Sequence, residues 1–150
     1  MQLIKKILFS FLVTTAMSGH AFCFKQAGET YQIDPQLLEA IAVHESRLQS
    51  SSVLENTNGT LDIGLMGINT VHLKDPYLLR AGFRSPQDMI DPCTNVKLGA
   101  WLLHRKILKW GSNWQAVGAY HSETPERNVA YQQKVSAVLL RLKKPRAVSR

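Results

Sequence analysis

The chain has 150 residues, which is enough for one compact domain and too few for two. Its formal net charge at neutral pH is +7. In a cytosolic protein such a basic excess would suggest nucleic acid as a partner, whereas in an exported protein it suggests an anionic polymer of the cell envelope.

The first 21 residues are typical of a secretory signal peptide. Two lysines precede an apolar run, 7–16, and the small-residue pattern Gly-His-Ala at 19–21 indicates a cleavage site. The apolar run is too short to span a bilayer. Phe22 stands where a lipobox before Cys23 would need a small residue, so we expect an exported, periplasmic protein without a transmembrane segment. Without the signal peptide, which holds two lysines, the chain keeps 129 residues and a net charge of +5.

The stretch 34–49 is predicted to be a helix, with Asp34 as its N-cap and Pro35 at its first helical position. At about 100° per residue its apolar side chains fall on one arc. Ser46 lies on the opposite, polar side, where we expect it to support the backbone or a loop. The residues of the apolar arc are Leu37, Leu38, Ile41, Ala42 and Leu48.

Glu45 lies near the centre of this apolar arc, where a helix would normally place a leucine. A carboxyl group among apolar neighbours loses hydration, so its pKa should rise and it can stay protonated near neutral pH. A general acid needs this state. Two alternatives stay open, namely a core glutamate satisfied by a hydrogen bond and a slightly rotated helix in which Glu45 meets water.

The segment 50–69 breaks the helical pattern and contains Asn58-Gly59, the strongest two-residue signal for a β-hairpin. Helices are predicted again after it. They cover about 70–79, 93–110 with Gly111 as its stop, 113–120 under an Asn113 cap, and a last stretch that Thr124-Pro125 opens.

The predicted fold class is mainly α (α+β). The helix 93–110 is crowded with apolar residues, so we expect it to be the central buried helix of a single domain with one small β-hairpin. In the last helix, one stripe carries Tyr131, Val135, Val138 and Leu142. The domain is expected to cover residues 22–142, and the basic residues of 143–150 form a C-terminal tail.

Two cysteines, Cys23 and Cys93, remain in the mature chain. In an oxidising compartment we expect them to form a disulfide. The bridge would close a loop of 70 residues. Closing a loop of this length can stabilise the folded state by roughly 4 kcal/mol.

Four short motifs follow one another in a fixed order: Glu45-Ser46, Gly64-Leu65-Met66-Gly67-Ile68-Asn69, Ala119-Tyr120-His121 and Tyr131. Together they resemble the small lytic transglycosylases of the lysozyme-like fold, which accompany bacterial secretion systems, pili and conjugation machines. The family pattern is Glu-Ser, then Gly-Leu-Met-Gln-Ile-Asn, then Ala-Tyr-Asn, then a tyrosine on a late helix. The cysteines, Asp91-Pro92-Cys93 and residues 114–120 also match, so the resemblance covers nearly the whole mature chain.

The resemblance implies a lytic transglycosylase whose partner is peptidoglycan and not nucleic acid. Glu45 would protonate the glycosidic oxygen after N-acetylmuramic acid and then, as carboxylate, take the proton of that sugar's 6-hydroxyl. This closes a 1,6-anhydro ring without water and opens the wall for an assembling machine. No cofactor is implied. A metal site is not expected either, because His44-Glu45 begins like a zinc-protease helix but Leu48 occupies the position of the second ligand.

A second carboxylate is a possible partner of Glu45. Asp62 lies just past the hairpin turn, where animal lysozymes place their second acid, so a muramidase that hydrolyses the bond with both acids is the alternative enzyme. Asp62 has its own structural alternative as a turn-exit residue that accepts hydrogen bonds from backbone N–H groups. The residues expected to bind or position substrate are Met66, Asn69, Tyr120, His121 and Tyr131. Tyr120 is expected to position Glu45 or the sugar by a hydrogen bond, and for both tyrosines a role as core aromatics is the alternative.

The sequence departs from the family pattern at two places. Gly67 stands where the family has Gln, and His121-Ser122-Glu123 replaces Asn-Ala-Gly. These departures motivate a third hypothesis, a non-catalytic glycan-binding assembly factor. Glu45 argues against it, because a binding module has no need for a costly acid on an apolar face.

Overall fold

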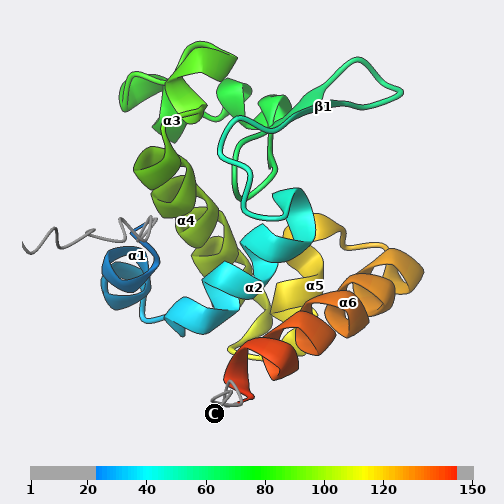
Figure 1. Ribbon diagram of the computed structural model, residues 1–150. Coiled ribbons are helices and arrows are strands. Elements are labelled where there is room, and N and C mark those ends of the chain that lie inside the picture. Colours follow the sequence, from blue (N-terminus) through cyan, green and yellow to red (C-terminus); the bar gives the residue numbers. More distant parts are fainter. Residues whose placement is uncertain (1–22, 145–150) are drawn as a thin grey trace, which may run out of the picture.

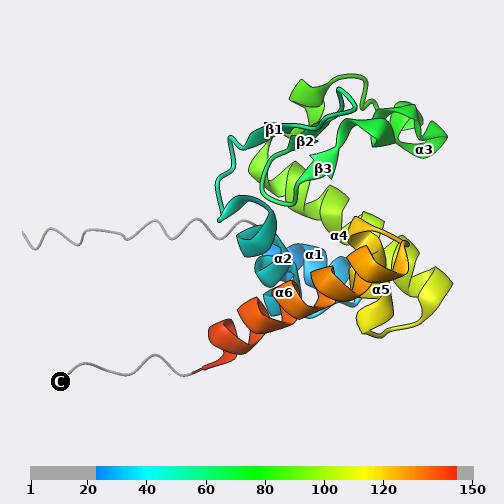
Figure 2. The ribbon, with the colours of Figure 1, turned by 90° about the vertical axis from the view of Figure 1, so that its right-hand side faces the viewer.

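The computed structural model describes residues 23–144. The expected signal peptide, 1–21, and positions 145–150 of the basic tail lie outside this range. The described chain is mainly helical and has a small antiparallel sheet at one end (Figures 1 and 2), which confirms the predicted α+β class. None of its described helices is both long enough and apolar enough to cross a membrane.

The helices predicted at 93–110, at 113–120 and after Thr124 are present, whereas the helices over 24–31 and 86–89 were not predicted. Residues 23–144 form eight helices in all. They are α1 (Phe24–Tyr31), α2 (Pro35–Ser46), the 3-10 helix η1 (Thr70–Lys74), α3 (Pro76–Arg80), the 3-10 helix η2 (Pro86–Met89), α4 (Pro92–Trp110), α5 (Trp114–His121) and α6 (Pro125–Lys143). The single helix predicted at 70–79 is in fact η1 and α3. Pro76 causes the break, because a proline lacks the N–H donor and holds the preceding Asp75 in an extended conformation.

Helix α2 begins as predicted, because the Asp34 carboxylate accepts a hydrogen bond from the backbone N–H of Gln36 at 2.9 Å. Its end differs from the prediction. Arg47 and Leu48 adopt left-handed φ values of 54° and 62°, so the helix stops at Ser46 and Leu48 lies outside it.

The sheet has three strands, β1 (Val53–Glu55), β2 (Leu61–Ile63) and β3 (Ile68–Asn69). The predicted hairpin joins β1 to β2, and a backbone hydrogen bond of 2.8 Å from Asn56 N to Thr60 O closes its turn. Strand β3, which the sequence did not reveal, pairs antiparallel with β2. Two residues are too few to show the alternation by which a strand is recognised.

Helix α4 connects the two ends of the molecule (Figure 1), as expected for the central buried helix. It contacts β3 at the sheet end and α1, α2 and α5 at the helical end, where α6 packs on α2 and α5. Its buried residues include Val96, Ala100 and Leu103, each with no exposed surface. The predicted disulfide is confirmed: Cys23 and Cys93, with Cα atoms 5.3 Å apart, join the beginning of α1 to the beginning of α4.

Candidate active site

Glu45 lies in the last turn of α2, and the loop 64–67 between β2 and β3 covers this end of the helix. The loop also buries Ser46, which is only 7% exposed although the helical pattern placed it toward solvent. The Ser46 hydroxyl donates to the carbonyl oxygen of Leu65 at 2.9 Å. Ser46 therefore supports the loop, as expected, but from a buried position.

The loop 64–67 is held from two further sides. Asn95, fully buried in α4, accepts a hydrogen bond from Met66 N at 2.7 Å and donates to Ile63 O at 2.9 Å. The Tyr120 hydroxyl donates to Met66 O at 2.8 Å. A tyrosine hydroxyl has a single proton, so this bond holds the loop and leaves none for Glu45. The sequence analysis missed Asn95. It could have been noticed as the one amide on the buried face of an otherwise apolar helix.

Gly67 packs directly against the carboxyl group of Glu45. A Cβ atom at this position would lie 2.8 Å from Glu45 Oε2, and the backbone φ is +58°, a conformation that side chains disfavour. Gly67, which replaces the glutamine of the family pattern, therefore lies in direct contact with the carboxyl group of Glu45 and leaves no room there for a larger side chain.

The other carboxyl oxygen of Glu45 accepts a hydrogen bond from the Tyr131 hydroxyl at 2.5 Å. Burial raises the pKa of Glu45 to about 7, the Tyr131 hydrogen bond works in the opposite direction, and the charge of Asp62 adds to the rise. Tyr131 is 3% exposed, and its burial and the nearby Glu45 raise its own pKa well above 10. Its hydroxyl therefore keeps its proton and remains a hydrogen-bond donor. The tyrosine that contacts Glu45 is Tyr131, and not Tyr120 as the sequence had suggested.

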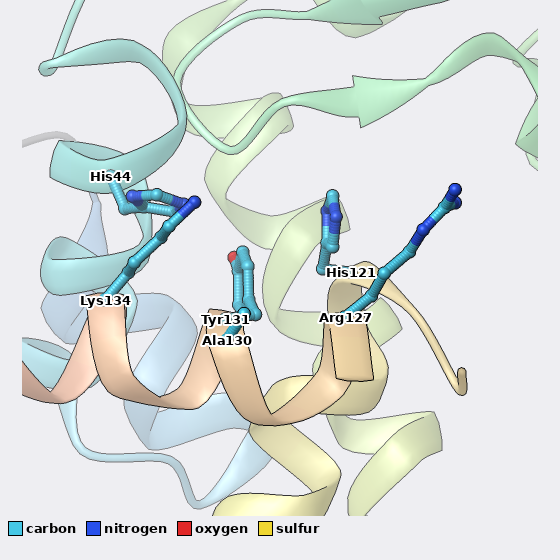
Figure 3. A pocket seen from close by; sticks show the side chains of 6 residues that line it. All are labelled: His44, His121, Arg127, Ala130, Tyr131 and Lys134. Atoms are coloured by element: carbon cyan, nitrogen blue, oxygen red, sulfur yellow. The ribbon is translucent and has the colours of Figure 1, made fainter. Parts of the chain in front are cut away.

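Two histidines flank Tyr131 (Figure 3). The His121 ring, at the end of α5, stacks on Tyr131 with a centroid distance of 5.0 Å and an interplanar angle of 2°. The His44 ring, from α2, meets Tyr131 edge-on at 5.2 Å. His121, a departure from the family pattern, therefore helps to hold the ring whose hydroxyl contacts Glu45.

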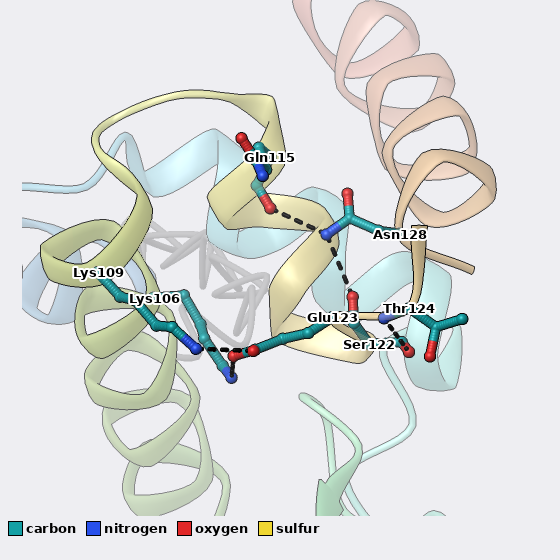
Figure 4. Close-up of polar contacts among 7 residues, drawn as sticks. All are labelled: Lys106, Lys109, Gln115, Ser122, Glu123, Thr124 and Asn128. Carbon is teal, nitrogen blue, oxygen red and sulfur yellow. Dashed lines mark hydrogen bonds and ion pairs between the residues drawn. The ribbon is translucent and has the colours of Figure 1, made fainter. Parts of the chain in front are cut away.

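The turn after His121 is fixed by Glu123, another departure from the family pattern (Figure 4). Glu123 receives hydrogen bonds of 2.7 Å from the ammonium groups of Lys106 and Lys109 on α4, and these contacts lower its pKa to about 2. Asn128 donates to Ser122 O at 3.1 Å. These bonds tie the α5–α6 turn to its neighbours and so help to position His121.

Asp62 lies on β2, close enough to Glu45 that its charge raises the pKa of Glu45. One Asp62 oxygen accepts a hydrogen bond from the Asn69 side-chain amide at 2.7 Å. Asn69 also donates to the hydroxyl of Thr60 and caps η1 through Val71 N. In this structure Asn69 thus stabilises the strand ends around Asp62.

Met66 differs from the other expected substrate residues. Its side chain has no exposed surface and packs on Gly99 of α4, so it supports the site from beneath and offers no surface to a sugar. Within residues 23–144, no group of three or more His, Cys, Asp or Glu side chains is placed to hold a metal ion.

A buried, protonable glutamate at the end of a helix, beside a small antiparallel sheet in a mainly helical domain, defines a lysozyme-like protein. Residues 22–136 match the family model of the transglycosylase SLT domain, and the chain belongs to this family.

Three similar proteins illustrate this relationship. A peptidoglycan-binding-like protein of Escherichia coli O157:H7 is 32% identical over 144 residues, which cover 89% of this chain and 85% of the relative. Protein IpgF of Shigella flexneri is 41% identical over 106 residues, covering 71% of this chain and 68% of the relative. The invasion protein IagB of Salmonella typhimurium strain SL1344 is 38% identical over 109 residues, covering 72% and 67%.

Proposed function

We propose that the protein is an exported lytic transglycosylase that cleaves the β-1,4 bond between N-acetylmuramic acid and N-acetylglucosamine in peptidoglycan. The observation that carries this proposal is the carboxyl group of Glu45, whose pKa burial raises to about 7 and which Tyr131 holds by a hydrogen bond. Membership of the transglycosylase SLT family supports the reaction class.

The reaction has two proton transfers, and Glu45 serves both. Protonated Glu45 donates to the glycosidic oxygen while the bond from this oxygen to C1 of N-acetylmuramic acid breaks. The Glu45 carboxylate then takes the proton of the 6-hydroxyl as the hydroxyl oxygen bonds to C1, so the 1,6-anhydro ring forms and no water is consumed. A pKa near neutral pH suits both steps, because neither the acid nor the carboxylate is then rare.

Tyr131 and Asp62 contribute to this cycle without a proton transfer of their own. The Tyr131 hydroxyl stabilises the carboxylate that remains after the first transfer, since it donates to Glu45 Oε1. Asp62 contributes negative charge on the sheet side of Glu45, where an oxocarbenium-like centre would be stabilised. The Asp62 carboxylate is also the residue on which the muramidase alternative depends, because a hydrolase would use Glu45 and Asp62 together and would let water attack C1.

The location and the biological role follow from the proposed substrate. Peptidoglycan lies outside the cytoplasm, and the disulfide suits the periplasm. The family match at 22–136 supports a catalytic domain at 22–142, after a signal peptide at 1–21 and before a basic tail at 143–150. Because one relative is an invasion protein, we infer that the enzyme opens the wall locally for a secretion, pilus or conjugation apparatus.

Cleavage of purified sacculi by Glu45→Gln tests the proposed function. The amide keeps the shape of the side chain but cannot donate the proton, so the rate should fall by about 10²–10⁴-fold. Glu39→Gln, on the same helix, is the matched control and should keep wild-type activity. Wild-type activity in Glu45→Gln would refute the catalytic role of Glu45, whereas an absence of cleavage by the wild type itself would favour a glycan-binding assembly factor.

A further inference from the structure

A pocket of about 250 Å³ is lined in part by Tyr131, the residue whose hydroxyl contacts Glu45, and Figure 3 shows the side chains around this pocket. We call it the basic pocket. Its lining residues are His44, His121, Arg127, Ala130, Tyr131 and Lys134. We propose that the basic pocket binds carboxylate groups of the peptide carried by N-acetylmuramic acid, so that the enzyme prefers peptide-bearing glycan strands to strands without peptides. This inference rests on the proposed function and names the form of the substrate.

The basic pocket and Glu45 share a neighbouring residue, Tyr131. Tyr131 forms part of the lining of the pocket, while the hydroxyl of the same residue contacts Glu45. In peptidoglycan the peptide is attached through the lactyl group of N-acetylmuramic acid, the sugar whose bond is cleaved. When this sugar is at Glu45, its peptide therefore starts next to the site, and the basic pocket is a neighbouring surface on which it can lie.

The side chains that line the basic pocket include two cations, Arg127 and Lys134, and no acid. Arg127 and Lys134 are exposed, lie two helical turns apart on α6, and form no ion pair within residues 23–144. Some other cations of the described chain are paired: Arg105 with Asp75, Lys106 and Lys109 with Glu123, and Lys143 with Asp34.

The histidines of the pocket add neutral hydrogen-bond donors to these charges. Burial lowers the pKa of both His44 and His121, and the charges of Lys134 and Arg127 lower it further, while Asp62 opposes the change at His121. At neutral pH the imidazoles are therefore largely uncharged and each presents one N–H group.

The stem peptide has the complementary chemistry, because it is short and carries several free carboxylates. The planar guanidinium of Arg127 can bind a carboxylate through two parallel hydrogen bonds, and Lys134 supplies a point charge at the other end of the pocket. Both groups are exposed, so we expect a modest, salt-sensitive preference and not an absolute requirement.

The test compares two soluble substrates of equal length, one with its peptides and one from which an amidase has removed them. For the wild type we expect kcat/KM to be about tenfold higher on the peptide-bearing strands, since a few exposed charge contacts together reach about this size. In the double variant Arg127→Gln/Lys134→Gln this ratio should fall toward one, mainly through KM. The matched control Arg84→Gln/Lys97→Gln removes the same charges outside the pocket and should keep the wild-type ratio.

Equal activity of the wild type on both substrates would overturn this inference, and so would an unchanged ratio in the double variant. In the second case an acidic segment of a partner protein would become the better occupant. Cleavage of both strands by the wild type and of neither by Glu45→Gln would still uphold the proposed function. If the wild type cleaves neither strand, the proposed function fails. The role of the basic pocket is then tested by binding, as the ratio of the affinities of Glu45→Gln for the peptide-bearing strand and for the strand without peptides.

Discussion

Replacing Glu45 by glutamine should stabilise the protein, and more so at alkaline pH. Burial raises the pKa of Glu45 from 4.5 to about 7, so between these pH values the folded state keeps a proton that the unfolded state has released. The free energy of unfolding therefore falls as the pH rises through this window, by about 3 kcal/mol in total, because one pKa unit corresponds to about 1.4 kcal/mol. Glutamine does not ionise, so the free energy of unfolding of the variant does not fall in this way as the pH rises.

Thermal unfolding at the two ends of the window measures the effect. Below the unfolded-state pKa the carboxyl is protonated in both states, so the comparison there captures only the change of side chain. In a domain of this size a loss of about 3 kcal/mol lowers Tm by about 6–12 °C. The difference in Tm between Glu45→Gln and wild type should therefore be about 6–12 °C larger at alkaline pH than at a pH below the unfolded-state pKa. The same difference at both ends would refute the buried, protonated carboxyl.

Two further substitutions test the surroundings of Glu45. Tyr131→Phe removes the hydrogen bond that lowers the pKa of Glu45, so the alkaline limb of the kcat/KM profile should move upward from near pH 7 by about one unit; a limb that stays in place contradicts the assignment of Tyr131. Gly67→Ala should lose about 1–2 kcal/mol of stability through its positive φ and also much of its activity, because the new methyl group meets Glu45. The control is Gly59→Ala, because Gly59 has a similar φ but a Cβ atom added there would have no neighbour within 4 Å. This variant should lose stability and keep its activity. Equal losses of activity in the two variants would show that Gly67 acts only through the backbone.

Local signals predicted most of the helical framework. Asp34 and Asn113 form the caps that their sequences indicate, and α4 ends at Trp110, before Gly111. Glu45 was also found from the sequence, because one acid among apolar positions of a helix stands out and the structure buries it. Such features depend on neighbours within a few residues, and a single sequence contains that information.

The remaining site depends on contacts between distant segments, which no local pattern contains. Ser46 has a polar helical position, but a loop 19 residues later covers it. The bond between Tyr131 and Glu45 spans 86 residues, and the sequence instead suggested Tyr120 as the residue that positions Glu45. The basic pocket gathers side chains from α2, α5 and α6, so helical periodicity could reveal only the part that lies on α6.

Product analysis tests the central claim most directly. We claim that Glu45 transfers a proton from the 6-hydroxyl of N-acetylmuramic acid, so that the ring closes without water. Digestion of purified sacculi by the wild type in heavy-oxygen water, followed by mass spectrometry, should give products that end in 1,6-anhydro-N-acetylmuramic acid, are lighter by one water than hydrolytic products and carry no heavy oxygen. Products with reducing ends that contain heavy oxygen would contradict the account and identify a muramidase that uses Glu45 and Asp62.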